Sequence, residues 1–183
     1  MTAHDLRQSS GRALLLAGPR GSGTTSVAVA IGQLLDEARV PHAVIDLDGL
    51  CRPDPDLTPD QFTAMMLDTL ATMTSRAVLA SLDGTATLVL ARAVRSLDEV
   101  ALLRAAVGGA LVALRLSVPL EITAARLRLH DTSDNPDSAV VTLAQGRLHL
   151  PAVSNHGRSP VDTAHEVLHR VGWIRRTITT MTP

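Results

Sequence analysis

Residues 13–35, ALLLAGPRGSGTTSVAVAIGQLL, hold the pattern that decides the fold of this chain. An apolar run leads into a glycine-rich turn and then into a helical stretch, as expected for a strand, a loop and a helix. Glycines let successive N–H groups of such a turn point inward as an anion-binding nest, and the helix that follows adds its positive N-terminal end. The stretch therefore predicts an oxyanion site at the start of the first helix.

The turn fits the P-loop pattern G-x-x-x-x-G-K-[ST] except at one position, where Thr24 replaces the lysine. That lysine normally bridges two phosphates and offsets charge in the transition state, so its loss is expected to cost about 3 kcal/mol, or about a hundredfold in rate. All 17 basic residues are arginine, and we consider Arg20, Arg126 and Arg128 as substitutes for the missing charge. The residues expected to bind phosphate are Gly18, Arg20, Gly21, Ser22, Gly23, Thr24, Thr25 and Ser26.

The remaining chain alternates short apolar runs with longer helical stretches, which predicts an α/β fold. We expect a three-layer, P-loop NTPase-like parallel sheet of about five strands flanked by helices. The expected strands are Arg12–Ala17, Ala43–Leu47, Thr87–Ala91, Leu111–Leu116 and, with a weaker pattern, Pro151–Ser154. The residues that mark helix starts are Thr58 to Gln61, Ser96 to Glu99, Val118 to Glu121, and Ser159 with Pro160. The expected ends of these four helices are about Leu82, Gly108, His130 and Gly172.

The chain length and local composition predict one domain. We expect a flexible leader at 1–11, a single kinase-like domain at 12–175 and a tail at 176–183. The polar, turn-rich segment 131–137 is interpreted as a surface flap.

Composition limits the function classes. Apolar residues make up 45% of the chain and the net charge is −1, which gives no reason to expect binding to nucleic acid or to an anionic membrane. No apolar run approaches the roughly 20 residues that span a bilayer. The single cysteine, Cys51, cannot form an internal disulfide, which favours a cytoplasmic location. The use of arginine alone is interpreted as the codon bias of a GC-rich, actinobacterial genome.

Three further segments carry a resemblance to known proteins. They are PHAVIDLDGLCR at 41–52, LVALRLSVPLEITAARLRLHD at 111–131 and VSNHGRSPVDTAHEVLHRVGW at 153–173. Together with the loop, they make the chain resemble the small-molecule kinase branch of the P-loop proteins, such as adenylylsulfate kinase, shikimate kinase and chloramphenicol phosphotransferase. The chain is also similar to actinobacterial ATP-binding proteins of this type.

The resemblance implies ATP and Mg²⁺ as cofactors and assigns roles to particular residues. Asp46 would lie near the metal together with Thr25, and Asp48 would orient or deprotonate the acceptor hydroxyl. Arg126 and Arg128 would approach the transferred phosphoryl group. The Arg158 turn would lie near the adenine. The missing lysine argues against unaltered ATP chemistry.

The residues themselves leave alternatives open at these positions. Asp46 and Asp48 lie at a strand end; their side chains are expected to point to opposite faces, and one of them could serve only to cap the turn. Arg126 and Arg128 are two apart on a helix and cannot share a face, so one is expected to be a surface charge.

Other motifs favour structural explanations. The H-E-x-x-H spacing from His165 to His169 suggests zinc, but its position on a terminal helix favours a solvated face. His130 and His156 remain candidates for acid–base work. Cys51 is interpreted as a buried thiol, and the methionines of the long helix, Met65, Met66 and Met73, as core. The weakly charged surface of that helix also suits a protein partner.

Three hypotheses about function follow. The first is a phosphotransferase that acts on a small molecule, with altered ATP chemistry and a role in secondary metabolism. The second is a repurposed natural-product enzyme that catalyses elimination or cyclisation while its loop holds a phosphate or sulfate leaving group. The third is a non-catalytic pseudo-kinase that stabilises a partner. A small-molecule substrate or anion is expected, a protein partner or homodimer is left open, and neither nucleic acid nor membrane is expected.

Overall fold

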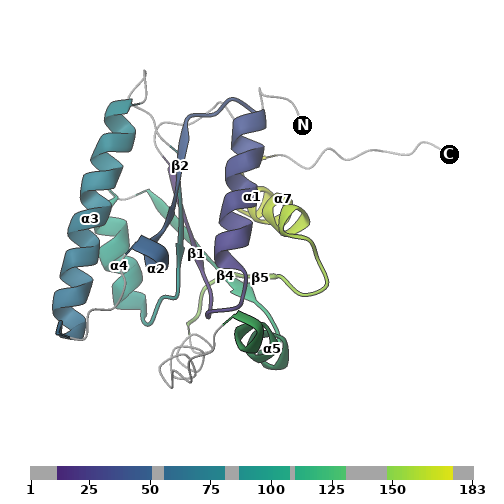
Figure 1. The fold of residues 1–183 in the computed structure, drawn as a ribbon. Helices are drawn as coiled ribbons and strands as arrows, with labels where there is room; N and C mark the ends of the chain where they lie inside the picture. The colour runs from purple at the N-terminus through teal and green to yellow at the C-terminus, as the bar shows by residue number, and fades with distance from the viewer. Residues whose placement is uncertain (1–11, 51–55, 81–86, 108–109, 131–147, 175–183) are drawn as a thin grey trace.

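The computed structural model describes residues 12–50, 56–80, 87–107, 110–130 and 148–174 (Figure 1). The predicted leader, the flap at 131–137, the tail and Cys51 lie outside these described residues.

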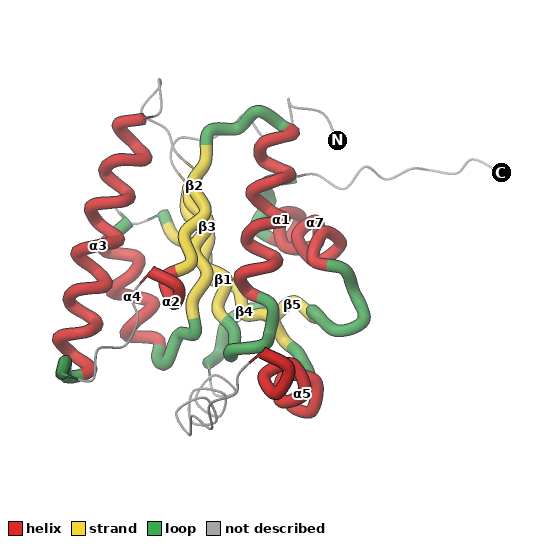
Figure 2. The backbone as a smooth tube through the Cα atoms, viewed as in Figure 1, coloured by secondary structure: helices red, strands yellow, loops and turns green. Residues whose placement is uncertain are grey.

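Five parallel strands form one sheet in the order β2-β3-β1-β4-β5 (Figure 2). Their bounds are β1 Arg12–Ala17, β2 His42–Asp46, β3 Thr87–Arg92, β4 Leu111–Ser117 and β5 Ala152–Ser154. The central strand is β1, where Leu14 pairs with Val89 of β3 and with Val112 of β4. A strand that is covered on both faces needs a continuous apolar run, and β1 is buried along nearly its whole length. The predicted parallel α/β fold is confirmed.

The helices are α1 Thr24–Glu37, α2 Leu47–Leu50, α3 Pro59–Ala80, α4 Leu97–Ala106, α5 Leu120–His130 and α7 Pro160–Arg170. The predicted caps form: Thr58 and Gln61 exchange reciprocal hydrogen bonds before α3. Ser96 accepts the amide of Glu99 at the start of α4. The last helix ends two residues before Gly172, whose positive φ of 71° suits the position after a helix end.

Two helix layers cover the sheet. Figure 1 shows α1 and α7 on one face and α3 with α4 on the other. The first face packs Ile31 and Leu35 of α1 with Val167 of α7, and the second packs Met66 and Leu70 of α3. Of the three methionines expected in the core, Met66 is buried and Met73 is partly buried, whereas Met65 is 41% exposed.

The chain order of the strands creates the place for a site. From β1 the chain crosses through α1 to β2, and from β3 it crosses through α4 to β4 on the other side of β1. Connections that leave in opposite directions open a crevice at the carboxyl ends of the strands, where such sheets bind ligands. Within the described residues, no helix combines the length and the apolar character needed to cross a membrane.

Candidate functional site

A cavity of about 600 Å³ lies at the carboxyl ends of the strands, a size within the usual range for small-molecule sites. It brings together most of the residues singled out from the sequence. Those in its lining are Gly18, Arg20, Gly21, Gly23, Thr24, Thr25, Ser26, Asp46, Asp48, Arg126 and Arg158. Four lining residues were not predicted: Gly49, Leu127, Asn155 and Pro160. Ser22, within the loop, is fully buried and does not line the cavity. The side chain of Arg128 lies outside the described part of the chain.

The backbone of the loop has the conformation that a nest requires. Gly21 and Gly23 adopt φ angles of 82° and 87°, in the region that favours glycine. The first intrahelical bond of α1 runs from the N–H of Val27 to the carbonyl of Gly23. The N–H groups before it have no intrahelical partner, and no side chain caps the helix at Gly23. These N–H groups are therefore available to an anion in the cavity.

Close packing explains why side chains are excluded from the loop. A Cβ atom at Gly18 would collide with the hydroxyl oxygen of Ser22. A Cβ atom at Gly23 would lie 2.7 Å from the side-chain nitrogen of Asn155. The Ser22 hydroxyl is buried with no hydrogen-bond partner among the described residues. The side chain of Ser22 thus fills the space beside Gly18, and the side chain of Asn155 fills the space beside Gly23.

Arg126 brings a positive charge to this loop from α5. Its Nη1 donates to the carbonyl oxygen of Gly21 at 3.1 Å. The same nitrogen would lie 3.8 Å from a Cβ atom at Gly23. A guanidinium is always charged and carries several donors, so one bond to the backbone leaves donors for a second acceptor. Arg126 thus lies where it can contact an anion held by the nest.

The residues expected at the metal are adjacent. The Thr25 hydroxyl donates to Oδ2 of Asp46 at 2.8 Å. Mg²⁺ prefers oxygen ligands and commonly takes one or two from the protein, with the remainder from water and phosphate. A carboxylate beside a hydroxyl at the mouth of a phosphate nest fits that preference, so Asp46 and Thr25 can hold Mg²⁺.

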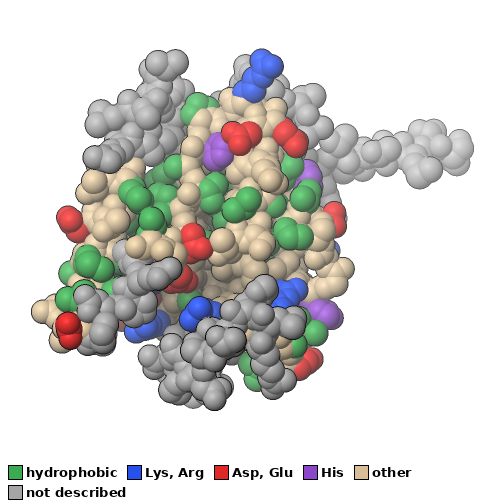
Figure 3. Space-filling view, in the orientation of Figure 1, with side chains coloured by type: hydrophobic (Ala, Val, Ile, Leu, Met, Phe, Trp, Pro, Cys, Tyr) green, Lys and Arg blue, Asp and Glu red, His purple; other side chains and the backbone are tan. Residues whose placement is uncertain are grey.

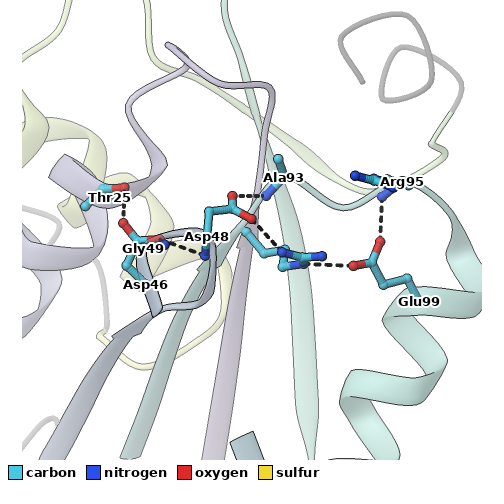
Figure 4. A network of polar contacts seen from close by, with 8 residues as sticks. Thr25, Asp46, Asp48, Gly49, Ala93, Arg95 and Glu99 are labelled. Carbon is cyan, nitrogen blue, oxygen red and sulfur yellow. Dashed lines mark hydrogen bonds and ion pairs between the residues drawn. The ribbon is translucent and has the colours of Figure 1, made fainter. Parts of the chain in front are cut away.

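Asp46 also caps a short helix that the sequence did not reveal. Its Oδ1 accepts from the N–H groups of Asp48 at 3.1 Å and Gly49 at 3.2 Å, so the chain turns into α2 directly after β2 (Figure 4). The prediction that Asp46 and Asp48 point to opposite faces was wrong: residues two apart on a strand share a face, and the strand in fact ends at Asp46. The helical turn brings both carboxylates to the same cavity.

Asp48 belongs to a chain of ion pairs at the ends of β2 and β3 (Figure 4). Its Oδ1 accepts from Arg92 Nη1 at 2.6 Å, and its Oδ2 accepts from the N–H of Ala93 at 2.7 Å. Arg92 Nε donates to Glu99 at 2.8 Å, and Glu99 also accepts the N–H of Arg95. Sequence reasoning missed Arg92 and Glu99, although a charged residue at the end of an apolar strand was a signal for the first.

Burial and charge act against each other at Asp48. Its side chain is 37% exposed, whereas that of Arg92 is 5% exposed. Loss of solvent around the carboxyl group raises the pKa of Asp48 above the ordinary value, while the Arg92 guanidinium and the Ala93 N–H oppose the rise. The net result is a carboxylate that accepts a proton more readily than a solvated aspartate.

The histidines of α7 form a separate, shallower feature. His165, Glu166 and His169 line a hollow of about 490 Å³ with Arg158. Glu166 pairs with Arg170, whose Nε donates to it at 2.8 Å. Within the described ranges no group of three or more histidine, cysteine, aspartate or glutamate side chains is placed to hold a metal.

The two remaining histidine candidates are not supported by contacts. His156 is exposed and does not line the main cavity, and the side chain of His130 lies outside the described residues.

Charges of both signs meet around the cavity. Figure 3 shows acidic and basic side chains near one another in the lower half of this face. The basic lining residues Arg20, Arg126 and Arg158 come from the loop, from α5 and from the turn before α7. The acidic lining residues come from the end of β2 and from α2.

Comparisons with known proteins show the fold. No family model matches the chain, and no curated protein matches it. A gluconokinase from Sinorhizobium meliloti is 20% identical with a TM-score of 0.57, over 90% of this chain and 95% of that one. An APS kinase from Mycobacterium tuberculosis, solved with AMPPNP and APS, is 21% identical with a TM-score of 0.57, over 90% and 99%. A shikimate kinase from Acinetobacter baumannii is 16% identical with a TM-score of 0.55, over 88% and 93%. The chain therefore shares the fold of P-loop small-molecule kinases.

Proposed function

We propose that this protein is a phosphotransferase that binds ATP with Mg²⁺ at Gly18–Thr25 and phosphorylates a hydroxyl group of a small molecule, with Arg126 in the role of the absent loop lysine. The observation that carries the proposal is the bond from Arg126 Nη1 to the carbonyl of Gly21 at 3.1 Å, which fixes a positive charge beside the nest. The match to kinases along nearly the whole chain supports it.

The loop and Arg126 make different contributions to phosphate binding and transfer. Backbone N–H groups at the start of α1 bind phosphate oxygens and orient them, without any side-chain charge. The Arg126 guanidinium then offsets the negative charge that increases on the transferred group, which is usually the largest catalytic effect. A cation supplied from α5 thus compensates for the neutral Thr24.

Asp46, Thr25 and Asp48 complete the site. When bound, Mg²⁺ would neutralise phosphate charge, and Asp46 with Thr25 would hold it. Asp48 orients the acceptor hydroxyl and takes its proton as the oxygen bonds to the terminal phosphorus of ATP, while the bond to the β-phosphate oxygen breaks and ADP leaves. The ion pair with Arg92 and the bond from Ala93 keep that carboxylate in place. Its raised pKa brings it closer to the range in which a general base is effective.

A second function uses the same nest without a nucleotide. Backbone N–H groups need only one bound oxyanion, so a repurposed natural-product enzyme could hold a phosphate or sulfate ester as leaving group. Thr24 supports this alternative, because a neutral side chain at that position removes the contact that joins two phosphates of a nucleotide. A cytoplasmic location and a role in secondary metabolism remain predictions under either function.

Calorimetry and an ATP hydrolysis assay test the proposal. We expect measurable binding of ATP with Mg²⁺ to the unaltered protein. Arg126→Gln should lower the hydrolysis rate about a hundredfold, and Arg126→Lys should restore part of it. The matched control is Arg104→Gln, because Arg104 also donates to a backbone carbonyl, that of Leu111, but does not line the cavity.

Three outcomes separate the alternatives. Absence of ATP binding with retained binding of phosphate or sulfate would favour the second function. Equal losses of hydrolysis rate in Arg126→Gln and Arg104→Gln would show that Arg126 acts only by stabilising the structure, not through its position at the cavity. Binding of ATP without turnover, in the presence of candidate acceptors, would indicate a pseudo-kinase.

A further inference from the structure

Asn155, the residue after β5, crosses from the last strand to the phosphate loop. Its side-chain Nδ2 donates to the carbonyl oxygen of Ser22 at 2.6 Å. Its backbone N–H donates to the carbonyl of Ser117 in β4 at 2.9 Å, so the residue is anchored to the sheet. Asn155 is 5% exposed. A buried amide at this position is therefore fixed at both its main chain and its side chain.

Thr163 of α7 contacts the side-chain oxygen, Oδ1, of Asn155. Its Oγ1 lies 2.8 Å from Asn155 Oδ1 and 3.1 Å from the carbonyl oxygen of Ser159, four residues earlier, and the single hydroxyl hydrogen serves the shorter bond, to Asn155. Thr163 is fully buried. The oxygen and nitrogen of an asparagine amide can exchange places by rotation. Rotation here would bring Oδ1 against the carbonyl of Ser22, two acceptors with no hydrogen between them. The carbonyl of Ser22, which can only accept, thus selects the orientation in which Nδ2 faces the loop, and the Thr163 hydroxyl bonded to Oδ1 holds the amide in it.

The contact with Ser22 determines the direction of the next N–H group. A peptide unit is planar and trans, so its C=O and its N–H point to opposite sides. Holding the carbonyl of Ser22 against Asn155 therefore directs the N–H of Gly23 away from Asn155. Glycine at Gly21 and Gly23 makes this segment easy to turn over, since both adopt φ values that glycine reaches without strain. Something outside the loop must hold the peptide in one orientation.

We propose that Asn155, held in place by Thr163, is a positioning residue that keeps the Ser22–Gly23 peptide turned so that its N–H can bind the phosphate. The inference rests on the proposed function, because it concerns the same nest. Two successive carbonyls of the loop are held from outside, that of Gly21 by Arg126 and that of Ser22 by Asn155. Arg126 supplies charge as well as position, whereas the neutral amide of Asn155 supplies position alone.

Two substitutions of similar shape test the proposal. Asn155→Leu removes the donor to Ser22, and Thr163→Val removes the hydroxyl that holds the amide in place. We expect the affinity for pyrophosphate, measured by calorimetry, to fall about tenfold in Asn155→Leu and about threefold in Thr163→Val. Thr163→Ser keeps the hydroxyl and should bind as the unaltered protein does. Thr69→Val is the matched control, because Thr69 likewise bonds to the carbonyl four residues earlier, that of Met65, but lies on α3.

Stability and turnover are measured alongside binding, so that each outcome is decisive. Urea unfolding shows whether a variant is folded under the conditions of the titration, and if Asn155→Leu is not, the comparison of Thr163→Val with Thr163→Ser decides. Folded variants that bind pyrophosphate as tightly as the unaltered protein would overturn the inference, even if ATP turnover is present. Pyrophosphate binding that depends on Asn155 in a protein without ATP turnover would support the inference and overturn the proposed phosphotransferase. Absence of pyrophosphate binding by the unaltered protein would overturn both.

Discussion

Two edges of the cavity use polar side chains in different ways. The phosphate edge consists of Gly18–Thr25 with Arg126 and Asn155. The carboxylate edge consists of Asp48, which lines the cavity, and of Arg92 and Glu99, which are buried and do not line it. On the phosphate edge, side chains from distant elements bond to backbone carbonyls. On the carboxylate edge, charged side chains bond to one another.

This difference suggests that the phosphate edge serves to present binding groups to a ligand, whereas the carboxylate edge serves to stabilise the fold. Bonds to carbonyls on the phosphate edge leave backbone N–H groups and a guanidinium directed at a ligand. The bonds of the carboxylate edge pair a buried guanidinium with two carboxylates, and a buried charge that loses its partner is strongly destabilising. We therefore expect changes on the phosphate edge to affect binding and changes at Arg92 to affect stability.

Replacing Arg92 should give the largest effect. Arg92→Met leaves Glu99, 9% exposed, and Asp48 without their cation, and the free energy of unfolding should fall by about 3–5 kcal/mol. Urea denaturation measures the loss. Arg92→Met combined with Glu99→Gln should recover part of it, since the uncompensated buried charge is removed. A loss below about 1 kcal/mol would contradict the distinction between the two edges.

Filling the nest should give the next largest effect. Gly23→Val puts a branched side chain at a φ of 87°, with its Cβ 2.7 Å from Asn155, and pyrophosphate affinity should fall about a hundredfold. Gly172→Val is the matched control, because Gly172 has a φ of 71° and nothing within 4 Å of an added Cβ. The control should lose stability and retain binding. If both variants lost affinity equally, backbone strain alone would explain the effect.

An exposed carboxylate at the start of α7 should show the smallest effect. The Ser159 hydroxyl donates to Asp162 at 2.7 Å, and this bond holds the pKa of Asp162 below its ordinary value. A lowered pKa means that the stabilisation is present above the ordinary aspartate value of about 3.9 and is lost as the pH falls through the lowered pKa. Asp162→Asn should remove this pH dependence.

Thermal unfolding between neutral and acidic pH measures the contribution of Asp162. The stability of the unaltered protein relative to Asp162→Asn should decline as the pH falls, and the difference at neutral pH should be much smaller than the loss in Arg92→Met. A difference of equal size would mean that burial does not decide the importance of a charged bond in this molecule.

Most of the fold could be predicted from the sequence, because its strands, turns and helix starts are specified by residues close together in the chain. The apolar run of β1 and the glycines that follow it specify a strand and a tight turn wherever they occur. Capping boxes such as Thr58 with Gln61 mark helix starts through bonds within four residues. One error fell where a side chain replaced a backbone partner: β2 ends at Asp46, whose carboxylate accepts the N–H groups of Asp48 and Gly49.

The site was predictable only in part, for a related reason. Gly18–Thr25, Asp46 and Asp48 follow strands in the chain, so their place at one edge of the sheet could be inferred. Asn155 contacts Ser22 across 133 positions of sequence, and Arg92 contacts Asp48 across 44. No periodicity or motif in the sequence predicts such a contact, because each contact depends on which strands lie next to one another in the sheet.

The sequence alone determined that an anion nest follows the first strand and that it lacks a lysine, because both follow from residue types at fixed spacing. Only the tertiary structure decided which other groups reach that nest. Sheet order places β4 and β5 beside β1, and the helix and turn that follow them carry Arg126 and Asn155 to the loop. The loop's own residues provide N–H groups, but residues more than a hundred positions away hold its carbonyls in place.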